Sequence, residues 1–137
     1  MKALLSVLAM AIMILGTSWI TPVRPGKSKG VIKTTNTPAP NFAFFRTHHQ
    51  GRGITATWGL DQNSGVSGFI VQKTYEDPGD PYSTWDNICS MNCGNERSFK
   101  HEDMNVSPGF ISYRVIGFLM SGGTIMSMIS TERIVSH

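Results

Sequence analysis

The sequence predicts an all-β protein, a small antiparallel sandwich of about seven strands. Three observations predict it. From residue 41 onward, short runs rich in β-branched and aromatic residues recur along the chain. Clusters of Gly, Pro, Asn and Asp separate these runs at regular intervals. No stretch of about 12 residues combines helical apolar periodicity with helix caps. Regularly spaced short strands with turn signals between them are typical of a sandwich.

The elements follow in order from these signals. The expected strands span about residues 41–47, 54–58, 66–75, 85–88, 97–103, 110–120 and 124–135. Breaks rich in Pro, Gly and Asn end them at residues 76–81, 91–95, 107–109 and 121–123. Because side chains alternate across a strand, one side of each run predicts the core. The predicted core residues are Ile54, Ala56, Trp58, Phe69, Val71, Ile111, Tyr113, Val115, Leu119, Ile125 and Ile129.

The chain divides into three parts by composition. Residues 1–18 combine Lys2, an apolar run and the small residues Gly16-Thr17-Ser18, which is the pattern of a signal peptide cleaved after Ser18. An uncleaved membrane anchor is the alternative, because the apolar run is near the lower limit for spanning a bilayer. Residues 19–40 have linker composition, with four Pro residues, and residues 41–137 form the sandwich domain. We expect a secreted or cell-envelope protein, associated with a membrane only if the leader stays uncleaved.

The distribution of charge argues against a nucleic-acid partner. The whole chain carries a net charge of +3. From residue 34 onward, however, seven bases stand against nine acids, a net charge of −2. The basic character therefore belongs to the leader and linker, whereas a nucleic-acid-binding domain clusters Lys and Arg on its folded surface.

The cysteines and other candidate ligands predict a structural role rather than a metal or cofactor. Cys89 and Cys93 are the two cysteines of the chain, and export permits a disulfide that would stiffen the turn between them. Two free thiols are the alternative. His48 and His49 are adjacent, so on an extended chain they point apart, and we expect them in a solvated loop. The carboxylates near Pro78-Gly79 could hold a hard cation but also fit ordinary turn chemistry; they are Glu76, Asp77 and Asp80.

The sharpest candidate site is the outward side of the longest strand. If Tyr113 and Val115 point inward, their neighbours in the alternation form an apolar outer face. We predict that this face binds a partner, a protein or cell-surface component; its residues are Ile70, Ile116, Phe118, Met120, Met126 and Met128. Two alternatives stay open. The segment with Phe42, Phe44 and Phe45 could cover the face, or a register slip could turn the last two methionines inward.

Several short motifs, in their order, resemble a fibronectin type III domain. They are Ile54-x-Ala56-x-Trp58, Gly68-Phe69-Ile70-Val71, Trp85-x-x-Ile88, Phe99-x-x-x-Asp103 and Tyr113-Arg114-Val115 before a Gly turn. The last two are similar to variants in secreted proteins of Bacteroidetes-type bacteria. The resemblance covers about residues 40–136 and implies a seven-stranded immunoglobulin-like sandwich. It also implies a core signature of Trp58 and Tyr113, with the Tyr113 hydroxyl closing a corner onto nearby backbone.

The resemblance implies binding, adhesion or spacing between modules and does not imply catalysis. The sequence also lacks Gly-x-Ser-x-Gly, His-Glu-x-x-His and a phosphate-binding Gly loop. We therefore expect a non-catalytic binding or assembly module. The alternatives are a secreted protease inhibitor using residues 76–83 and the cysteine turn, and a carbohydrate-binding module using Tyr82 and Trp85. For these two aromatic residues we favour packing against the edge of the core.

Overall fold

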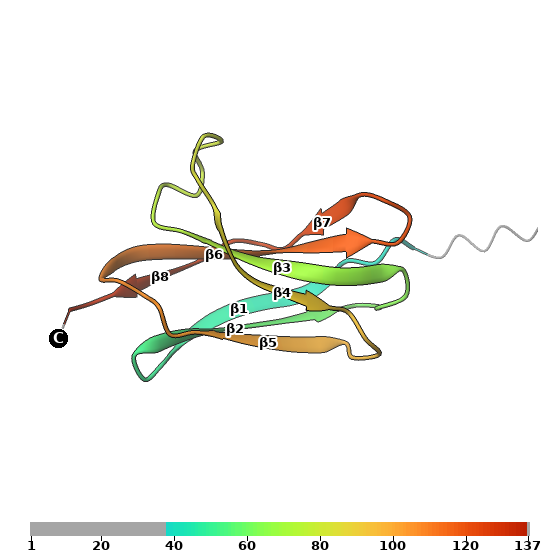
Figure 1. Cartoon of the computed structure of the whole chain (residues 1–137), viewed down its shortest axis with the longest axis horizontal. Coiled ribbons are helices and arrows are strands. Elements are labelled where there is room, and N and C mark those ends of the chain that lie inside the picture. Colours follow the sequence, from blue (N-terminus) through green and yellow to red (C-terminus); the bar gives the residue numbers. More distant parts are fainter. Residues whose placement is uncertain (1–37, 137) are drawn as a thin grey trace, which may run out of the picture. The chain divides into compact units, whose positions relative to one another are not determined.

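The computed structural model describes residues 38–136, and in this part of the chain every regular element is a β-strand. The predicted signal peptide, most of the predicted linker and His137 lie outside the described residues. Figure 1 shows the arrangement of the eight strands in this part. Their bounds are β1 Phe42–Gln50, β2 Gly53–Leu60, β3 Val66–Thr74, β4 Asp86–Asn92, β5 Ser98–Asp103, β6 Gly109–Leu119, β7 Thr124–Met126 and β8 Ser130–Ile134.

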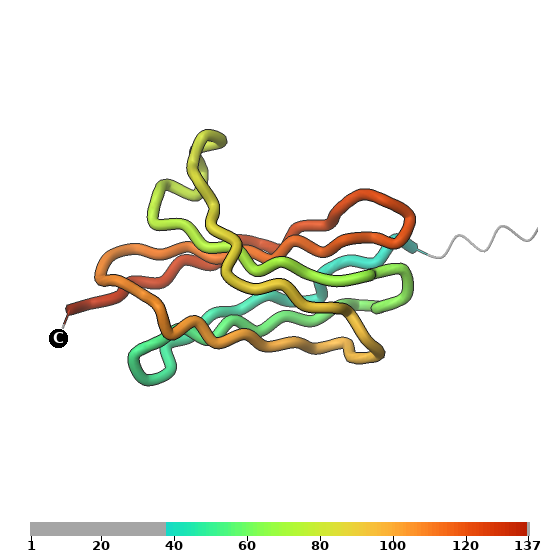
Figure 2. The backbone as a smooth tube through the Cα atoms, in the orientation of Figure 1, coloured from blue at the N-terminus to red at the C-terminus, as the bar shows by residue number. Residues whose placement is uncertain are grey.

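The strands form two antiparallel sheets. One has three strands in the order β1-β2-β5, and the other has five, in the order β4-β3-β6-β7 with β8 also paired to β6. In Figure 1 β2 and β5 lie below β3, β6 and β7, and the loop between β3 and β4 stands out from the body in Figure 2. The prediction of an all-β, antiparallel, two-sheet protein is confirmed.

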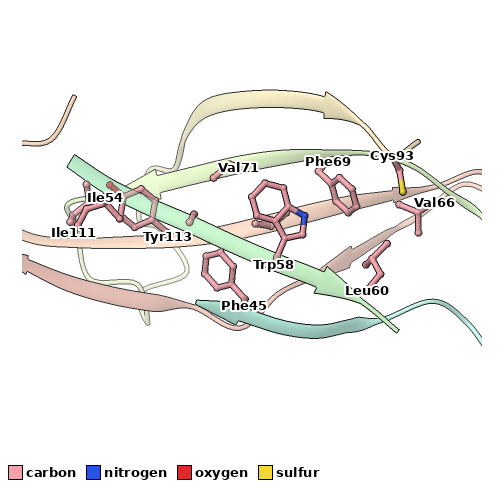
Figure 3. Packing of buried hydrophobic residues seen from close by; sticks show 12 residues of the cluster. Phe45, Ile54, Trp58, Leu60, Val66, Phe69, Val71, Cys93, Ile111 and Tyr113 are labelled. Atoms are coloured by element: carbon pink, nitrogen blue, oxygen red, sulfur yellow. The ribbon is translucent and has the colours of Figure 1, made fainter. Parts of the chain in front are cut away.

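The core lies between the inward faces of β2, β3 and β6. The predicted residues of β2, β3 and β6 are buried, with Leu119 packed at the margin. Trp58 is fully buried and meets Phe69 edge-on, with ring centroids 5.8 Å apart. Phe99 of β5 stacks on Trp58 at the same centroid distance. Figure 3 shows Trp58 and Tyr113 pointing into this cluster from strands of the two sheets, as the sequence predicts.

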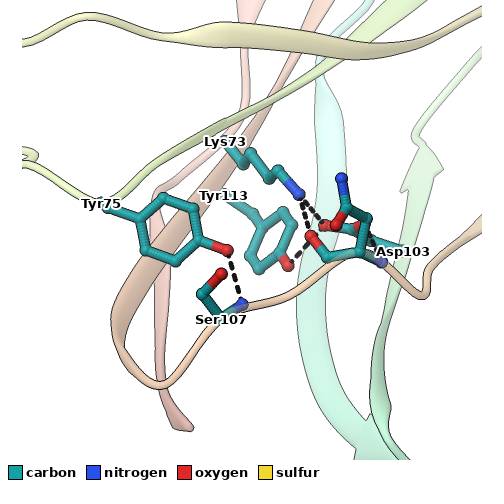
Figure 4. A network of polar contacts seen from close by, with 6 residues as sticks. Lys73, Tyr75, Asp103, Ser107 and Tyr113 are labelled. Carbon is teal, nitrogen blue, oxygen red and sulfur yellow. Dashed lines mark hydrogen bonds and ion pairs between the residues drawn. The ribbon is translucent and has the colours of Figure 1, made fainter.

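A buried polar cluster closes one end of the core. The ammonium of Lys73 lies 2.8 Å from a carboxylate oxygen of Asp103, and both side chains are buried. The Tyr113 hydroxyl donates to the same oxygen at 2.9 Å. The resemblance implied a bond from this hydroxyl to nearby backbone, so that expectation is corrected: the acceptor is a side chain of β5 (Figure 4). Burial and the Asp103 carboxylate raise the pKa of Tyr113 above its ordinary value.

The last predicted strand is two strands, and this corrects one core residue. Ser127 is buried, and its hydroxyl accepts the N–H of Val115 and donates to the carbonyl of Met128, each at 2.8 Å. The ladder then resumes with Ser130 opposite Tyr113. Met128 and Ile129 thus stand where regular pairing needs a single residue opposite Arg114. This is a bulge, and it shifts the alternation of the side chains that follow. Ile129, predicted to be in the core, is therefore 40% exposed.

Two other predicted boundaries are wrong. His48 and His49 belong to the end of β1 rather than to a loop, because β1 pairs with β2 as far as Gln50. Both histidines are exposed. Similarly, residues 91 and 92 were predicted as a turn but extend β4, where they pair with β3.

The predicted disulfide is absent: Cys89 and Cys93 are free thiols. The extension of β4 explains why. Cys89 lies in β4, and Cys93 follows directly after its end, where its N–H donates to the carbonyl of Ser67 in β3 at 3.0 Å. Four positions along such an extended chain span about 13 Å, whereas a disulfide needs Cα atoms within about 7 Å. Cys93 is buried in the core and Cys89 packs against it. Burial raises the pKa of both thiols above its ordinary value.

Candidate binding face of the five-stranded sheet

The outward side of the five-stranded sheet carries a continuous apolar row, which brings together three of the predicted site residues. Ile116 of β6 pairs with Ile70 of β3 on one side and with Met126 of β7 on the other. Residues directly opposite each other in a ladder point to the same face. Phe118 stands in the adjacent row, opposite Gly68 and Thr124. Ile70 and Ile116 are half-buried, whereas Met126 is 55% exposed and Phe118 of the adjacent row is 37% exposed, so this apolar surface is partly open to solvent.

The remaining two predicted residues lie at the margins. Met120 follows β6 and is exposed, and its N–H donates to the carbonyl of Gly65 at 2.8 Å. Met128 lies in the bulge and takes no part in the ladder. With Met126 and residues 41–45, at the start of β1, it lines a groove of 320 Å³. The start of β1 therefore lies across a groove from the margin at Met126 and Met128, and Ile70 and Ile116 do not line this groove.

Sequence reasoning missed a polar row directly beside the apolar one. Gln72 pairs with Arg114 in the ladder and accepts its Nε–H at 2.7 Å. The Gln72 amide in turn donates to Asn87 of β4 at 2.7 Å. The guanidinium of Arg114 lies over the ring of Trp85, 3.9 Å from its centroid. The signal for this row was the alternation itself, because Gln72 and Arg114 are each two residues from an isoleucine of the apolar row.

The stacked guanidinium has a defined electrostatic state. Partial burial lowers the pKa of Arg114 from its ordinary value, because the charged form loses hydration. Arginine nevertheless stays protonated in proteins. The outer face therefore presents one fixed positive charge at the border of its apolar row.

Trp85 and Tyr82 do not lie where the sequence predicted. Both were expected to pack against the edge of the core. Trp85 is half-buried instead by Arg114 on the outer face, and Tyr82 is 91% exposed on the β3–β4 loop. The reason is that the loop projects away from the sheets before β4 begins at Asp86 (Figure 2).

The three carboxylates of the β3–β4 loop take part in turn structure. Glu76 accepts the N–H of Thr84 at 2.7 Å. Asp77 and Asp80 accept the N–H groups two residues further on, each at 2.9 Å. These are the bonds of ordinary turns. Within residues 38–136, no group of three or more His, Cys, Asp or Glu side chains is arranged to hold a metal ion. The same residues contain no helix long and apolar enough to cross a membrane.

Comparison with known proteins gives a likeness of fold alone. No known family matches the sequence, and no curated protein is similar to it. The structure is similar to solved structures of pectate lyases. For Pel3 from Pectobacterium carotovorum the TM-score is 0.55 at 13% identity, over 70% of this chain and 27% of the lyase. For PelI from Erwinia chrysanthemi, solved in complex with tetragalacturonic acid, it is 0.52 at 16% identity, over 67% of this chain and 27% of the lyase. The chain thus spans about a quarter of the length of these enzymes.

Proposed function

We propose that this protein is a non-catalytic, exported binding module with a fibronectin type III-like sandwich, and that it contacts a protein partner through the outer face of the five-stranded sheet. The strand pairing supports the fold. In immunoglobulin-like sandwiches the first, second and fifth strands share one sheet, while the third, sixth and seventh share the other. This chain has the same division, with β4 added beside β3.

One observation carries the functional proposal: a partly exposed apolar row lies on the outward face of an antiparallel sheet. Such a sheet usually keeps one face polar and solvated. Here Ile70, Ile116 and Met126 stand side by side across three strands, with Phe118 in the next row. Contiguous exposed apolar surface marks an interaction site, and methionine adapts its shape to a partner.

The experiment is site-specific photocrosslinking of the full chain in the cells that produce it. Benzoylphenylalanine at position 118 is expected to give a discrete crosslinked species. The matched control places it at position 110, because Phe110 lies on the same strand and the same face and is 66% exposed. Discrete crosslinking at position 110 and none at position 118 contradicts the proposed face. Absence of crosslinks at both positions contradicts a stable partner on this sheet.

A carbohydrate-binding function is the second candidate, and the loop aromatic Tyr82 is the observation that favours it. The side chain is almost fully exposed on a projecting loop, where its ring could stack on a sugar. The similar PelI structure contains tetragalacturonic acid, so this oligosaccharide is the natural probe. Binding to the full chain that is lost in Tyr82→Ala supports this candidate, and equal binding by the two proteins opposes it.

A further inference from the structure

The outer face of the five-stranded sheet carries no acidic residue. Register assigns sixteen ladder residues to this face in the described part of the chain: Gly68, Ile70, Gln72, Thr74, Asn87, Ser90, Asn92, Phe110, Ser112, Arg114, Ile116, Phe118, Thr124, Met126, Thr131 and Arg133. Two are arginines, although the chain from residue 34 onward has a net charge of −2. The face is therefore positive on an otherwise acidic body.

The acids on the same strands and on the β3–β4 loop are turned away or already bonded. In the strand ladder Asp86 stands opposite Lys73, and Glu132 stands opposite Ile111. Lys73 and Ile111 are both buried residues of the inward face. The carboxylates of the β3–β4 loop accept backbone N–H groups of that loop. The positive charge of the face is consequently not neutralised by an ion pair within residues 38–136.

Arg114 is held in one geometry with part of its donor set free. Its Nε–H is fixed by Gln72, and its plane is fixed against the ring of Trp85. Among the described residues, no hydrogen bond or ion pair uses its two terminal nitrogens. A guanidinium binds a carboxylate best through two parallel N–H donors. Because Arg114 is already ordered, a ligand carboxylate would cost little additional side-chain entropy.

We infer that the protein partner presents a carboxylate to the terminal nitrogens of Arg114 and apolar side chains to the row of Ile70, Ile116 and Phe118. This inference rests on the proposed function and specifies its partner as an acidic–apolar segment. Arginine and tryptophan are among the residues enriched at binding hot spots. An ion pair bordered by apolar contacts also gains strength because the contacts exclude water.

A protein segment fits this surface better than a sugar. The row beside Arg114 on the Ile116 side is aliphatic, and in the row on its other side the hydroxyls of Ser112 and Thr131 are already bonded to each other at 2.8 Å. One face of the Trp85 ring is covered by the guanidinium at 3.9 Å, so that face cannot stack on a sugar. An acidic sugar such as galacturonate shares the carboxylate, and for this reason it enters the test as a separate probe.

The test selects random linear peptides, displayed on phage, against the immobilised full chain. The expected winners carry Asp or Glu beside apolar residues. A synthetic winner is then titrated against the wild type and against the variants Arg114→Gln, Phe118→Asp and Arg133→Gln, after thermal unfolding has shown each variant to be folded. Arg133→Gln is the matched control, because Arg133 lies on the same face at the far end, over Phe110.

The expected result is a loss of about 30-fold or more in affinity for Arg114→Gln, an equal loss for the peptide with its acid changed to the amide, and little change for Arg133→Gln. Selected peptides whose binding requires Phe118 but neither an acidic residue nor Arg114 overturn this inference and leave the proposed function intact. Winners indifferent to both sites, or no winners, count against both. Tetragalacturonic acid binding through Arg114, without peptide binding, replaces the protein partner by a sugar.

Discussion

The buried pair of Lys73 and Asp103 gives the most quantitative prediction. Lys73→Met leaves the Asp103 carboxylate buried without its cation. Removing one member of a buried pair costs about 3–5 kcal/mol of unfolding free energy, because a desolvated charge remains. The carboxylate keeps the Tyr113 hydroxyl and the N–H of Asn105 as donors, at 2.9 and 3.0 Å, so we expect the lower end of this range.

The double variant Lys73→Met/Asp103→Asn has no buried charge at this place. Its loss of stability is therefore expected to be smaller than the sum of the two single losses, by about 2 kcal/mol or more. The assay is urea unfolding of the full chain followed by tryptophan fluorescence, since Trp58 lies in the core. The unfolding free energy must fall with urea concentration at the same slope in every variant, so that the comparison reports stability alone.

The control uses an exposed pair on the same strand. Lys100 and Glu102 of β5 are 2.7 Å apart, and both side chains are largely exposed. Their double-mutant cycle is expected to show no measurable coupling, because water and salt screen such pairs. Additive single effects at Lys73 and Asp103, or equal coupling in the two cycles, would refute the reasoning.

Three further predictions follow from the described contacts. The pKa of Tyr113 is raised in the folded state, so the stability that this residue provides is present below pH 10.0 and is lost as pH rises further. Above pH 10.0 the wild type should therefore lose unfolding free energy more steeply than Tyr113→Phe. Parallel curves of unfolding free energy against pH would contradict this. Ser127→Ala leaves the buried N–H of Val115 without its acceptor and should cost about 1–3 kcal/mol in urea unfolding; an unchanged midpoint would mean that the bulge does not need this bond. When the unreduced, denatured protein is alkylated, mass spectrometry should find both Cys89 and Cys93 modified. An unalkylated protein that is lighter by the mass of two hydrogen atoms would instead show that the two cysteines form a disulfide.

Much of the binding face followed from alternation in the sequence. Once Tyr113 and Val115 were assigned inward, Ile116 and Phe118 had to point outward, and the pairing of Ile116 with Ile70 brought the two strands together. The polar row was missed because the position of Arg114 depends on its contact with Trp85, which lies 29 positions earlier and outside any strand. Sequence alternation does not indicate which loop residue folds back onto a sheet.

The sequence by itself determined the strands, their order and most of the buried residues, because period-two alternation and turn residues are local properties of the chain. Tertiary structure decided what depends on pairing between distant strands. It extended β4 through Asn92 and thereby separated the two cysteines. It inserted the bulge that exposes Ile129, and it placed Lys73 beside Asp103. Each of these features follows from hydrogen bonds between strands or from burial. Both depend on residues that are distant in the sequence, so the residues next to a position do not predict them.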